Sequence, residues 1–211
     1  MIKNSTKAKP DIECILRTLK NLYPTAKTAL DYAKPHELLF AVILSAQTTD
    51  KQVNKVTKAL FQKYKNLEDF AMVDISVFEK DISSIGLYKS KAKSIVNAAK
   101  AIVENHKGIV PKSMSELVAL PGVGRKTANV VLGELYGIYE GIAVDTHVKR
   151  LAQKYGLSIY SDPIKIEKDL MKIIPQKEWR EFTLRMIQYG RDYCPANCKN
   201  CPNCPLWKCV K

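Results

Sequence analysis

The sequence predicts an all-α fold. Apolar residues recur every three to four positions through most of the chain, which is the spacing of one face of an α-helix. No stretch alternates apolar and polar residues in the manner of a strand, and the connections are short and marked by Pro, Gly, Asn or Asp. These observations indicate about nine or ten helices and no sheet.

Several helices are predicted from residues that can cap their first turn. Asp11 precedes the first apolar stripe as a candidate N-cap. Ser113 and Glu116 have the spacing of a capping box. Asp162 stands before a proline, a pair that is typical of the start of a helix.

Glycines predict where other helices end. Gly108 follows the longest stripe, Gly156 follows the stripe that starts at Val148, and Gly190 follows the last stripe. The apolar stripes cover residues 12–19, 53–64, 92–103, 148–155, 166–174 and 179–189. Such stripes indicate core packing and by themselves carry no function.

Composition excludes several classes of protein. The chain has 211 residues, of which 46% are hydrophobic, with nine Gly and ten Pro, so collagen-like, low-complexity and disordered chains are excluded. The longest apolar stretch, residues 38–46, is shorter than the ~20 residues that span a bilayer. The N-terminus shows no secretory signal. We therefore expect a soluble intracellular protein without a membrane partner.

The chain is strongly basic. It carries 34 Lys and Arg against 21 Asp and Glu, a formal net charge of +13. Such an excess is typical of a protein that binds a polyanion, usually a nucleic acid. The alternative is a set of solvated lysine-rich helix faces, and the basic residues are scattered rather than gathered in one arm.

The segment LPGVGRKTA, residues 120–128, has the features of an anion-binding turn. Pro121 ends one helix, while Gly122 and Gly124 permit a positive φ or a close approach of the backbone to a ligand. A second helix begins near Gly124, beside Arg125, and its first N–H groups lack partners within the helix. This is typical of a helix–hairpin–helix motif, which holds a DNA phosphate without reading sequence. A tight turn without a ligand is the alternative.

Two residues are candidates for catalysis. Lys126 lies in the first turn of the second helix, where the positive end of the helix dipole disfavours an ammonium and favours a nucleophilic amine. The alternative is another lysine that faces phosphates. Asp145 is its candidate partner and precedes the stripe that begins at Val148. It is also a candidate N-cap, and a capping residue can still project into a cleft.

Five of the six cysteines lie between Cys194 and Cys209. An intracellular chain keeps its thiols reduced, so this cluster indicates a metal or iron–sulfur site rather than a disulfide scaffold. Cys14 stands apart, in an apolar helical pattern, and is expected to be a buried core thiol.

Five ordered segments resemble the endonuclease III family of DNA glycosylases, from about residue 38 to residue 209. Residues 44–50 (LSAQTTD) and 85–92 (IGLYKSKA) are similar to the family's two DNA-facing loops. Residues 120–132 are similar to its hairpin, residues 144–147 (VDTH) to its catalytic aspartate segment, and the cysteine tail to its cluster loop.

The resemblance implies a bifunctional base excision repair enzyme. Its glycosylase activity would remove oxidised pyrimidines, and its AP lyase activity would cleave the strand 3′ to the abasic site by β-elimination. Lys126 would attack C1′ of the damaged nucleotide and form a Schiff base. Asp145 would help to deprotonate Lys126 and stabilise the cationic sugar as the base leaves. No metal is needed at the reacting carbon.

The damaged base must be flipped out of the duplex. By resemblance, Gln47 fills the space that it leaves, and Leu87 wedges into the base stack, as apolar side chains do in other kinked duplexes. Without the resemblance, Gln47 is an ordinary residue at a helix C-terminus and Leu87 an ordinary core residue. Asp50 is expected to be the N-cap of the helix that carries Val53.

The resemblance also implies a 4Fe-4S cluster with the ligands Cys194, Cys201, Cys204 and Cys209. The family's ligands follow C-x6-C-x2-C-x5-C, but the last gap here is one residue short, and an additional cysteine, Cys198, lies inside the first gap. Cys198 therefore keeps the ligand set open, and a tetrahedral zinc site is the alternative.

The cluster loop would serve DNA binding rather than catalysis. It would place Lys199 and the nearby Arg191 against DNA phosphates and so add salt-dependent affinity.

Two other kinds of function compete with this one: a related glycosylase of other damage specificity and a non-catalytic DNA-binding protein. Among the related glycosylases, an adenine-specific mismatch enzyme of the family would lack the lysine at position 126 and add a C-terminal domain, and an 8-oxoguanine glycosylase would keep the lysine but lack the cysteines. A non-catalytic helix–hairpin–helix DNA-binding protein would not need both Lys126 and Asp145.

The resemblance implies two helical domains with a DNA-binding cleft between them. Residues 25–136 would form a six-helix domain that carries the hairpin, and residues 1–24 and 137–211 a helical domain with the cluster. The expected partner is double-stranded DNA with damaged bases or abasic sites, bound by a monomer. The expected location is cytoplasmic, at the nucleoid.

Overall fold

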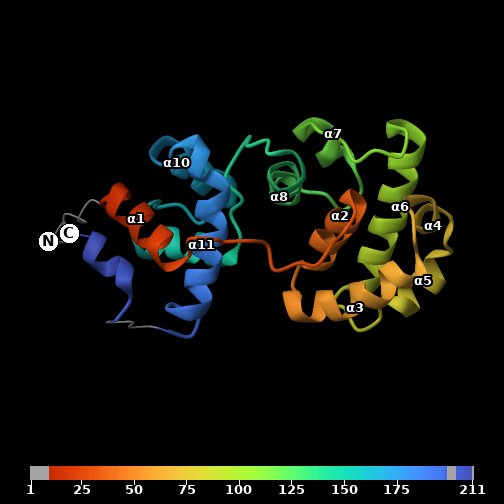
Figure 1. Cartoon of the computed structure of the whole chain (residues 1–211), viewed down its shortest axis with the longest axis horizontal. Coiled ribbons are helices and arrows are strands. Elements are labelled where there is room, and N and C mark those ends of the chain that lie inside the picture. The colour runs from red at the N-terminus through yellow and green to blue at the C-terminus, as the bar shows by residue number, and fades with distance from the viewer. Residues whose placement is uncertain (1–9, 199–202, 211) are drawn as a thin grey trace, which may run out of the picture. The chain divides into compact units, whose positions relative to one another are not determined.

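The structure, a computed structural model, describes residues 10–198 and 203–210. Within these ranges it contains eleven α-helices, two short 3₁₀-helices and no sheet, apart from one isolated antiparallel bridge between Pro10 and Val210. The predicted all-α class is confirmed. The chain divides into unit 1, Met1–Thr28 with Tyr139–Lys211, and unit 2, Ala29–Ile138 (Figure 1). No helix in the described ranges has the length and apolar character that a membrane crossing needs.

Unit 2 is built around one helix that is buried on every side. Its helices are α2 (Pro35–Leu44), α3 (Asp50–Lys63), α4 (Leu67–Met72), α5 (Ile75–Asp81), α6 (Tyr88–His106), α7 (Met114–Ala119) and α8 (Arg125–Tyr136). All residues of α2 after its first proline are buried. The ring of Phe70 lies 4.9 Å from that of Phe40 in α2 and 6.0 Å from that of Phe78. The longest apolar stretch of the sequence is therefore the central helix of this core.

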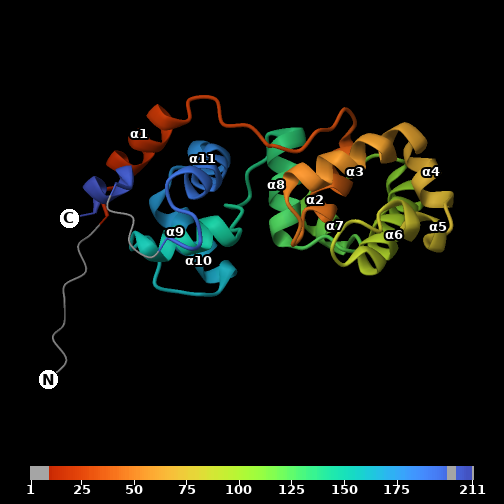
Figure 2. The same ribbon diagram turned by 90° about the horizontal axis from the view of Figure 1, so that it is seen from below.

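Unit 1 joins the first helix of the chain to the last ones. It contains α1 (Ile12–Leu22), α9 (Thr146–Lys154), α10 (Pro163–Ile173), η1 (Gln176–Glu178), α11 (Trp179–Asp192) and η2 (Pro205–Cys209). α11 packs against α9 and α1, and η2 lies beside α1 (Figure 2). The Asp11 N–H donates to the Cys209 carbonyl at 2.8 Å, so the two ends of the described chain are hydrogen-bonded.

Most predicted helix starts are confirmed. The side chains of Asp11, Ser113 and Asp162 each accept a hydrogen bond from the backbone N–H three residues later, at 3.0, 3.3 and 3.3 Å. The prediction for Asp50 is wrong. The N-cap of α3 is Thr49, whose hydroxyl accepts from the backbone at 3.3 Å, and Asp50 is the first helical residue.

One predicted helix end is also wrong. Gly108 and Gly156 follow the ends of α6 and α9 with φ of 74° and 72°, as expected of C-terminal glycines. Gly190 lies inside α11, which continues to Asp192. A Cβ at Gly190 would lie 2.6 Å from Nδ1 of His147, so this glycine is explained by the close approach of α9.

We expect the substitution Gly190→Ala to lower the free energy of unfolding by about 1–2 kcal/mol. Overpacking costs about 1–3 kcal/mol, and the helix propensity of alanine offsets up to about 1 kcal/mol of it. Chemical denaturation measures the change. In a His147→Ala background the same substitution should cost less, because the clashing ring is gone. A Gly190→Ala protein as stable as the wild type would contradict this explanation.

Candidate nucleic-acid interface and active site

The hairpin between α7 and α8 is held from the inside by two apolar residues. Leu120 and Val123 are buried, and the Val123 N–H donates to the Leu120 carbonyl at 3.1 Å. Helix α8 then begins at Arg125, after Gly124 in an extended conformation. The first N–H groups of α8 thus follow directly on a fixed turn, which is the arrangement that binds a phosphate.

The two hairpin glycines are needed for different reasons. Gly122 has a φ of 77°, and a Cβ there would lie 2.5 Å from the Cβ of Ser94 in α6. The packing of the hairpin on α6 therefore requires Gly122. Gly124 has a φ of −93°, and a Cβ there would have no atom within 4 Å. Nothing within the fold requires a glycine at this position, whereas a close external ligand would.

Lys126 is exposed in the first turn of α8, and the neighbouring Arg125 is also exposed. An amine at this position lies at the positive end of the helix dipole. The residues Ala128, Val131 and Leu132 of α8 are buried, so packing fixes the direction of this helix after the hairpin. Lys126 therefore extends from a rigid element.

Asp145 belongs to unit 1, whereas Lys126 belongs to unit 2. Asp145 follows the buried residues Ile142, Ala143 and Val144 and is itself half-buried. Its Oδ1 accepts from the Val148 N–H at 2.8 Å, so it is the N-cap of α9. One carboxylate oxygen accepts this bond, and the second oxygen keeps lone pairs that can accept further hydrogen bonds.

Gln47 and Leu87 share an unusual backbone conformation. Their φ angles are 54° and 60°, in the left-handed region, which costs a non-glycine residue roughly 1–2 kcal/mol. Both are exposed, Leu87 to 58%. Leu87 is therefore not a core residue, and Gln47 lies in the turn after α2 rather than in the helix. Such strain is typical of functional positions.

The two loops that carry these residues lie close together in unit 2. A Cβ at Gly86 would lie 3.5 Å from the Gln47 carbonyl oxygen. The Gln52 side chain donates to the hydroxyl of Ser84 at 3.0 Å. The structure thus brings together two loops that are about forty positions apart in the sequence.

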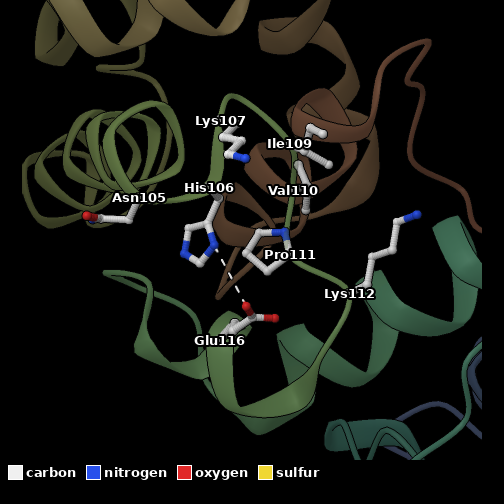
Figure 3. Close-up of a pocket in the computed structure, with 8 residues that line it drawn as sticks. All are labelled: Asn105, His106, Lys107, Ile109, Val110, Pro111, Lys112 and Glu116. Carbon is white, nitrogen blue, oxygen red and sulfur yellow. Dashed lines mark ion pairs between the residues drawn. The ribbon is translucent and has the colours of Figure 1, made fainter.

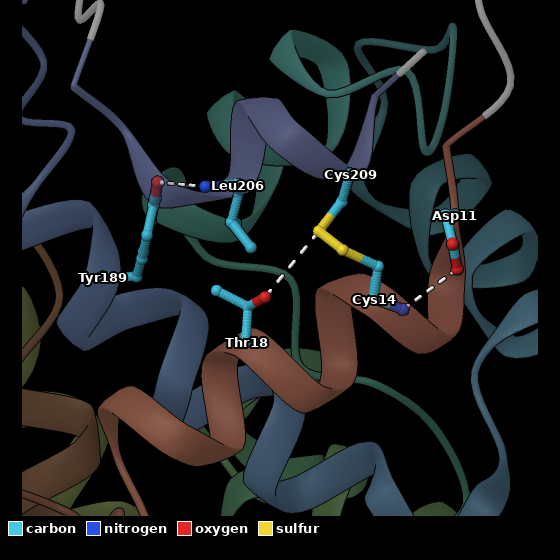
Figure 4. Close-up of a disulfide and its surroundings, with 6 residues drawn as sticks. All are labelled: Asp11, Cys14, Thr18, Tyr189, Leu206 and Cys209. Carbon is cyan, nitrogen blue, oxygen red and sulfur yellow. Dashed lines mark hydrogen bonds between the residues drawn. A yellow bond between two sulfur atoms is a disulfide. The ribbon is translucent and has the colours of Figure 1, made fainter.

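The cysteine tail is described in part. Cys194 and Cys204 are buried and form no disulfide, while Cys201 and Lys199 lie outside the described residues. Cys209 forms a disulfide with Cys14 of α1, and the Thr18 hydroxyl lies 3.7 Å from the Cys209 sulfur (Figure 4). Cys198 is likewise disulfide-bonded.

The pairing corrects the expectation for Cys14, which is half-buried and disulfide-bonded rather than a buried thiol. Its stripe points to the core, but the C-terminal 3₁₀-helix brings Cys209 beside α1. A sulfur in a disulfide cannot ligate iron as a thiolate. Within the described ranges, no three His, Cys, Asp or Glu side chains are grouped to hold a metal ion. The described residues in this state therefore do not fit a four-thiolate cluster.

Two cationic side chains of α9 fasten the cysteine loop. Arg150 donates to the Cys194 carbonyl at 2.6 Å, and Lys154 Nζ lies 3.0 Å from the Cys194 sulfur. The Tyr189 hydroxyl accepts from the Leu206 N–H at 3.1 Å, and burial raises the pKa of Tyr189 to about 12. The loop is thus tied to the helix that Asp145 caps.

Sequence reasoning missed Arg150 and a second residue, Lys91, which is buried in unit 2. Lys91 stands on the same helix face as the apolar stripe of α6, one turn before Ile95. A lysine on an apolar stripe is the signal that could have identified it. No comparable signal marks Arg150.

A shallow pocket lies elsewhere on unit 2, at the end of α6 and the start of α7 (Figure 3). His106 Nδ1 lies 4.0 Å from a carboxylate oxygen of Glu116 at its edge. None of its lining residues was predicted as a site residue.

A family model of the HhH-GPD superfamily of base excision DNA repair proteins matches residues 40–176. The chain is 52% identical to endonuclease III of Synechocystis sp. over 192 residues, which cover 91% of this chain and 88% of that protein. It is 46% identical to endonuclease III of Bacillus subtilis over 196 residues, which cover 92% and 89%.

Solved structures of endonuclease III are also similar to this chain. A trapped covalent intermediate of endonuclease III with DNA, in an estranged-adenine complex, matches with a TM-score of 0.89 and 44% identity over 95% of this chain and 94% of that chain. A non-covalent endonuclease III–DNA complex matches with the same values. A thermostable thymine-DNA glycosylase, with a TM-score of 0.83 and 24% identity over 95% of each chain, shares the fold.

We expect the two hairpin glycines to separate stability from DNA binding. Gly122→Ala should lower the free energy of unfolding by about 2 kcal/mol or more, because it adds both backbone strain and overpacking. Gly124→Ala should change stability by less than about 0.5 kcal/mol but weaken DNA binding by roughly tenfold, the cost of one charged hydrogen bond. Denaturation and fluorescence anisotropy at fixed salt measure these effects. Equal behaviour of the two variants would contradict the assignment.

Proposed function

Since the chain belongs to the endonuclease III family of base excision repair DNA glycosylases, we propose that Lys126 and Asp145 carry out the excision of oxidised pyrimidines from duplex DNA. The chain is a DNA N-glycosylase with AP lyase activity, and damaged duplex DNA is its partner. What is proposed is the role of each residue in that reaction.

The chemistry requires a neutral amine and a carboxylate. The Lys126 amine attacks C1′ of the damaged nucleotide, the C1′–N bond breaks, and the base leaves with the bonding electrons. The carboxylate of Asp145 takes a proton from the amine and stabilises positive charge on the sugar. The sugar ring then opens: the C1′–O4′ bond breaks, O4′ takes up the proton, and a Schiff base between C1′ and Lys126 forms. This Schiff base loses a proton from C2′ and expels the 3′ phosphate, which cuts the strand.

The observation that carries this assignment is the placement of Lys126. It is exposed in the first turn of α8, directly after a hairpin whose Gly124 leaves room for a ligand. A phosphate on the α8 N–H groups would bring the sugar next to it within reach of the lysine. Asp145 supports the assignment as an aspartate at the N-cap of a separate helix, fixed by its capping bond.

The strained loops would read the duplex. Leu87 is apolar, exposed and left-handed, which suits a wedge between base steps. Gln47 presents an amide that can donate to or accept from either type of base left without its partner. Arg125 and Arg191, both exposed, and Lys199 would contact phosphates and make binding salt-dependent. We expect a monomer that works at the nucleoid.

The competing functions are disfavoured by the same residues. An adenine-specific mismatch glycosylase would not carry a lysine at position 126. A non-catalytic DNA-binding protein would need the hairpin but neither Lys126 nor Asp145.

Borohydride trapping tests the catalytic pair. We expect a covalent protein–DNA adduct with a duplex that contains thymine glycol, and none with Lys126→Ala or with undamaged DNA. Asp145→Asn should slow the single-turnover excision rate by about 10²-fold or more, as expected for loss of a general base. Arg125→Ala, in the same turn of α8, is the matched control and should weaken binding yet still form the adduct.

The alternatives give different results. An adduct with an abasic duplex alone would keep the lyase chemistry of Lys126 but overturn the proposed base specificity. If Lys126→Ala retained the adduct, or if the folded wild-type protein bound DNA without trapping, the assignment of Lys126 would be wrong.

A 4Fe-4S cluster is the cofactor that we propose for the cysteine loop, with the ligands Cys194, Cys201, Cys204 and Cys209. The two buried thiols, Cys194 and Cys204, support it. Cys209 can join them only after its disulfide with Cys14 has been reduced. The cluster would order the loop, and we assign it no step in base removal.

Reconstitution with iron and sulfide tests the ligand set. We expect about four iron atoms per chain under reducing conditions and fewer after prior oxidation. Cys14→Ser should retain the iron and lessen its sensitivity to prior oxidation, Cys198→Ser should retain the iron under reducing conditions, and Cys209→Ser should lose it. Loss of iron in Cys198→Ser or Cys14→Ser, with retention in Cys209→Ser, would show that the ligand set is wrong. Iron analysis and visible absorbance provide the measurement.

A further inference from the structure

Lys91 is a buried cation with a complete set of acceptors. It lies in the first turn of α6, with 5% of its surface exposed. Its ammonium donates to the Leu44 carbonyl at 2.8 Å, to the Ala46 carbonyl at 2.5 Å and to the Thr48 hydroxyl at 3.1 Å. An ammonium has three donors, and here each one has a partner.

Two of these acceptors lie on either side of Gln47. Ala46 precedes Gln47 and Thr48 follows it, so the ammonium holds the turn at both of its ends. The carbonyl of Leu44 is the last of α2, and the turn begins there. The backbone of Gln47 is left-handed between these anchors.

The backbone of Lys91 is hydrogen-bonded to Leu87, the left-handed residue of the second loop. Its N–H donates to the Leu87 carbonyl at 3.1 Å, which is the first hydrogen bond of α6 after Leu87. One residue therefore contacts two of the three left-handed non-glycine positions in the described chain, Leu87 through its backbone and the Gln47 turn through its side chain. Burial lowers the pKa of Lys91, so the ammonium depends on these acceptors.

We propose that Lys91 is a positioning residue for base extrusion, which holds Gln47 and Leu87 in the conformation that enters the duplex. The inference rests on the roles proposed above for those two residues. A capping bond at the end of α2 alone would need only the Leu44 carbonyl. The bonds on both sides of Gln47 go beyond capping the helix and point to a role in base extrusion, because they fix the turn that would enter the space left by the base.

The consequence is specific to steps in which a base must leave the stack. Without the ammonium, Gln47 can relax toward ordinary backbone angles, and the fraction of protein with both loops in place falls. The apparent rate of a step that needs this conformation falls by the same fraction. An abasic nucleotide has no base to extrude, so its cleavage depends less on the two loops.

The test compares Lys91→Met with Lys100→Met in single turnover. Met retains the unbranched apolar side chain and removes the charge, and Lys100 is exposed on the same helix. We expect Lys91→Met to excise thymine glycol roughly tenfold more slowly, while cleavage of a ready-made abasic site stays within about twofold. The fluorescence rise of 2-aminopurine next to the lesion, which reports unstacking, should shrink in parallel. Lys100→Met should match the wild type in all three measurements.

Other outcomes separate the possible failures. Equal loss of both activities, in proportion to the folded fraction measured by circular dichroism, would show that Lys91 only stabilises the fold. If Lys91→Met does not fold, Thr48→Val removes one of its three acceptors with little change in shape and should reduce excision and the fluorescence rise but not abasic-site cleavage. Full excision by Thr48→Val in that case would overturn the proposal.

Two further variants test the roles on which the proposal rests. If Gln47→Ala and Leu87→Ala both excise at the wild-type rate, those roles fail. If they are impaired while Lys91→Met is not, only the proposal for Lys91 fails. Glycine adopts a left-handed φ without strain. In a Gln47→Gly background, Lys91→Met should therefore lower the excision rate by a smaller factor than in the wild type.

Discussion

The burial of α2 on every side is the constraint on which the rest of unit 2 depends. A helix without a solvent-facing side cannot leave its last carbonyls to water, and an unsatisfied buried carbonyl costs about 1–3 kcal/mol. Lys91 supplies, from α6, the donor for the last of them, the carbonyl of Leu44, and it also donates to the carbonyl of Ala46 in the turn that follows. The same bonds fix where α2 ends and how the chain turns toward α3. The Lys91 side chain therefore both satisfies the end of a core helix and holds the Gln47 turn.

Strain of this size matters because proteins are only marginally stable. Two left-handed residues cost roughly 2–4 kcal/mol together, set against a typical folding free energy of 5–15 kcal/mol. An exposed leucine alone has little meaning, since apolar atoms make up much of any protein surface. An exposed leucine with a φ of 60°, beside a glutamine with a φ of 54°, marks a surface shaped for something other than stability.

Local sequence signals predicted the helices. The residues that they misassigned or missed are those whose role depends on contacts distant in the sequence. Asp11 and Asp162 cap helices because a cap depends only on its own first turn. Gly190 was wrongly predicted to end a helix, because a glycine is needed there to make room for the ring of His147 from another helix. Cys14 was misassigned in the same way, because Cys209 is 195 positions away. Lys126 and Asp145 were predicted from motifs, whereas the partners of Lys91 became visible only in the folded chain.

The contacts in unit 1 give the cysteine loop a route by which it would affect the proposed reaction without taking a step in it. Asp145 caps α9, and the loop is bound to the same helix by Arg150 and Lys154 through the carbonyl and the sulfur of Cys194. Gly190 lets α11 approach α9 closely enough for these contacts. A change in the loop therefore shifts the restraints on α9, and the carboxylate at its N-terminus moves with the helix. Chemistry that depends on sub-ångström placement is sensitive to such a shift even when every reacting group is intact.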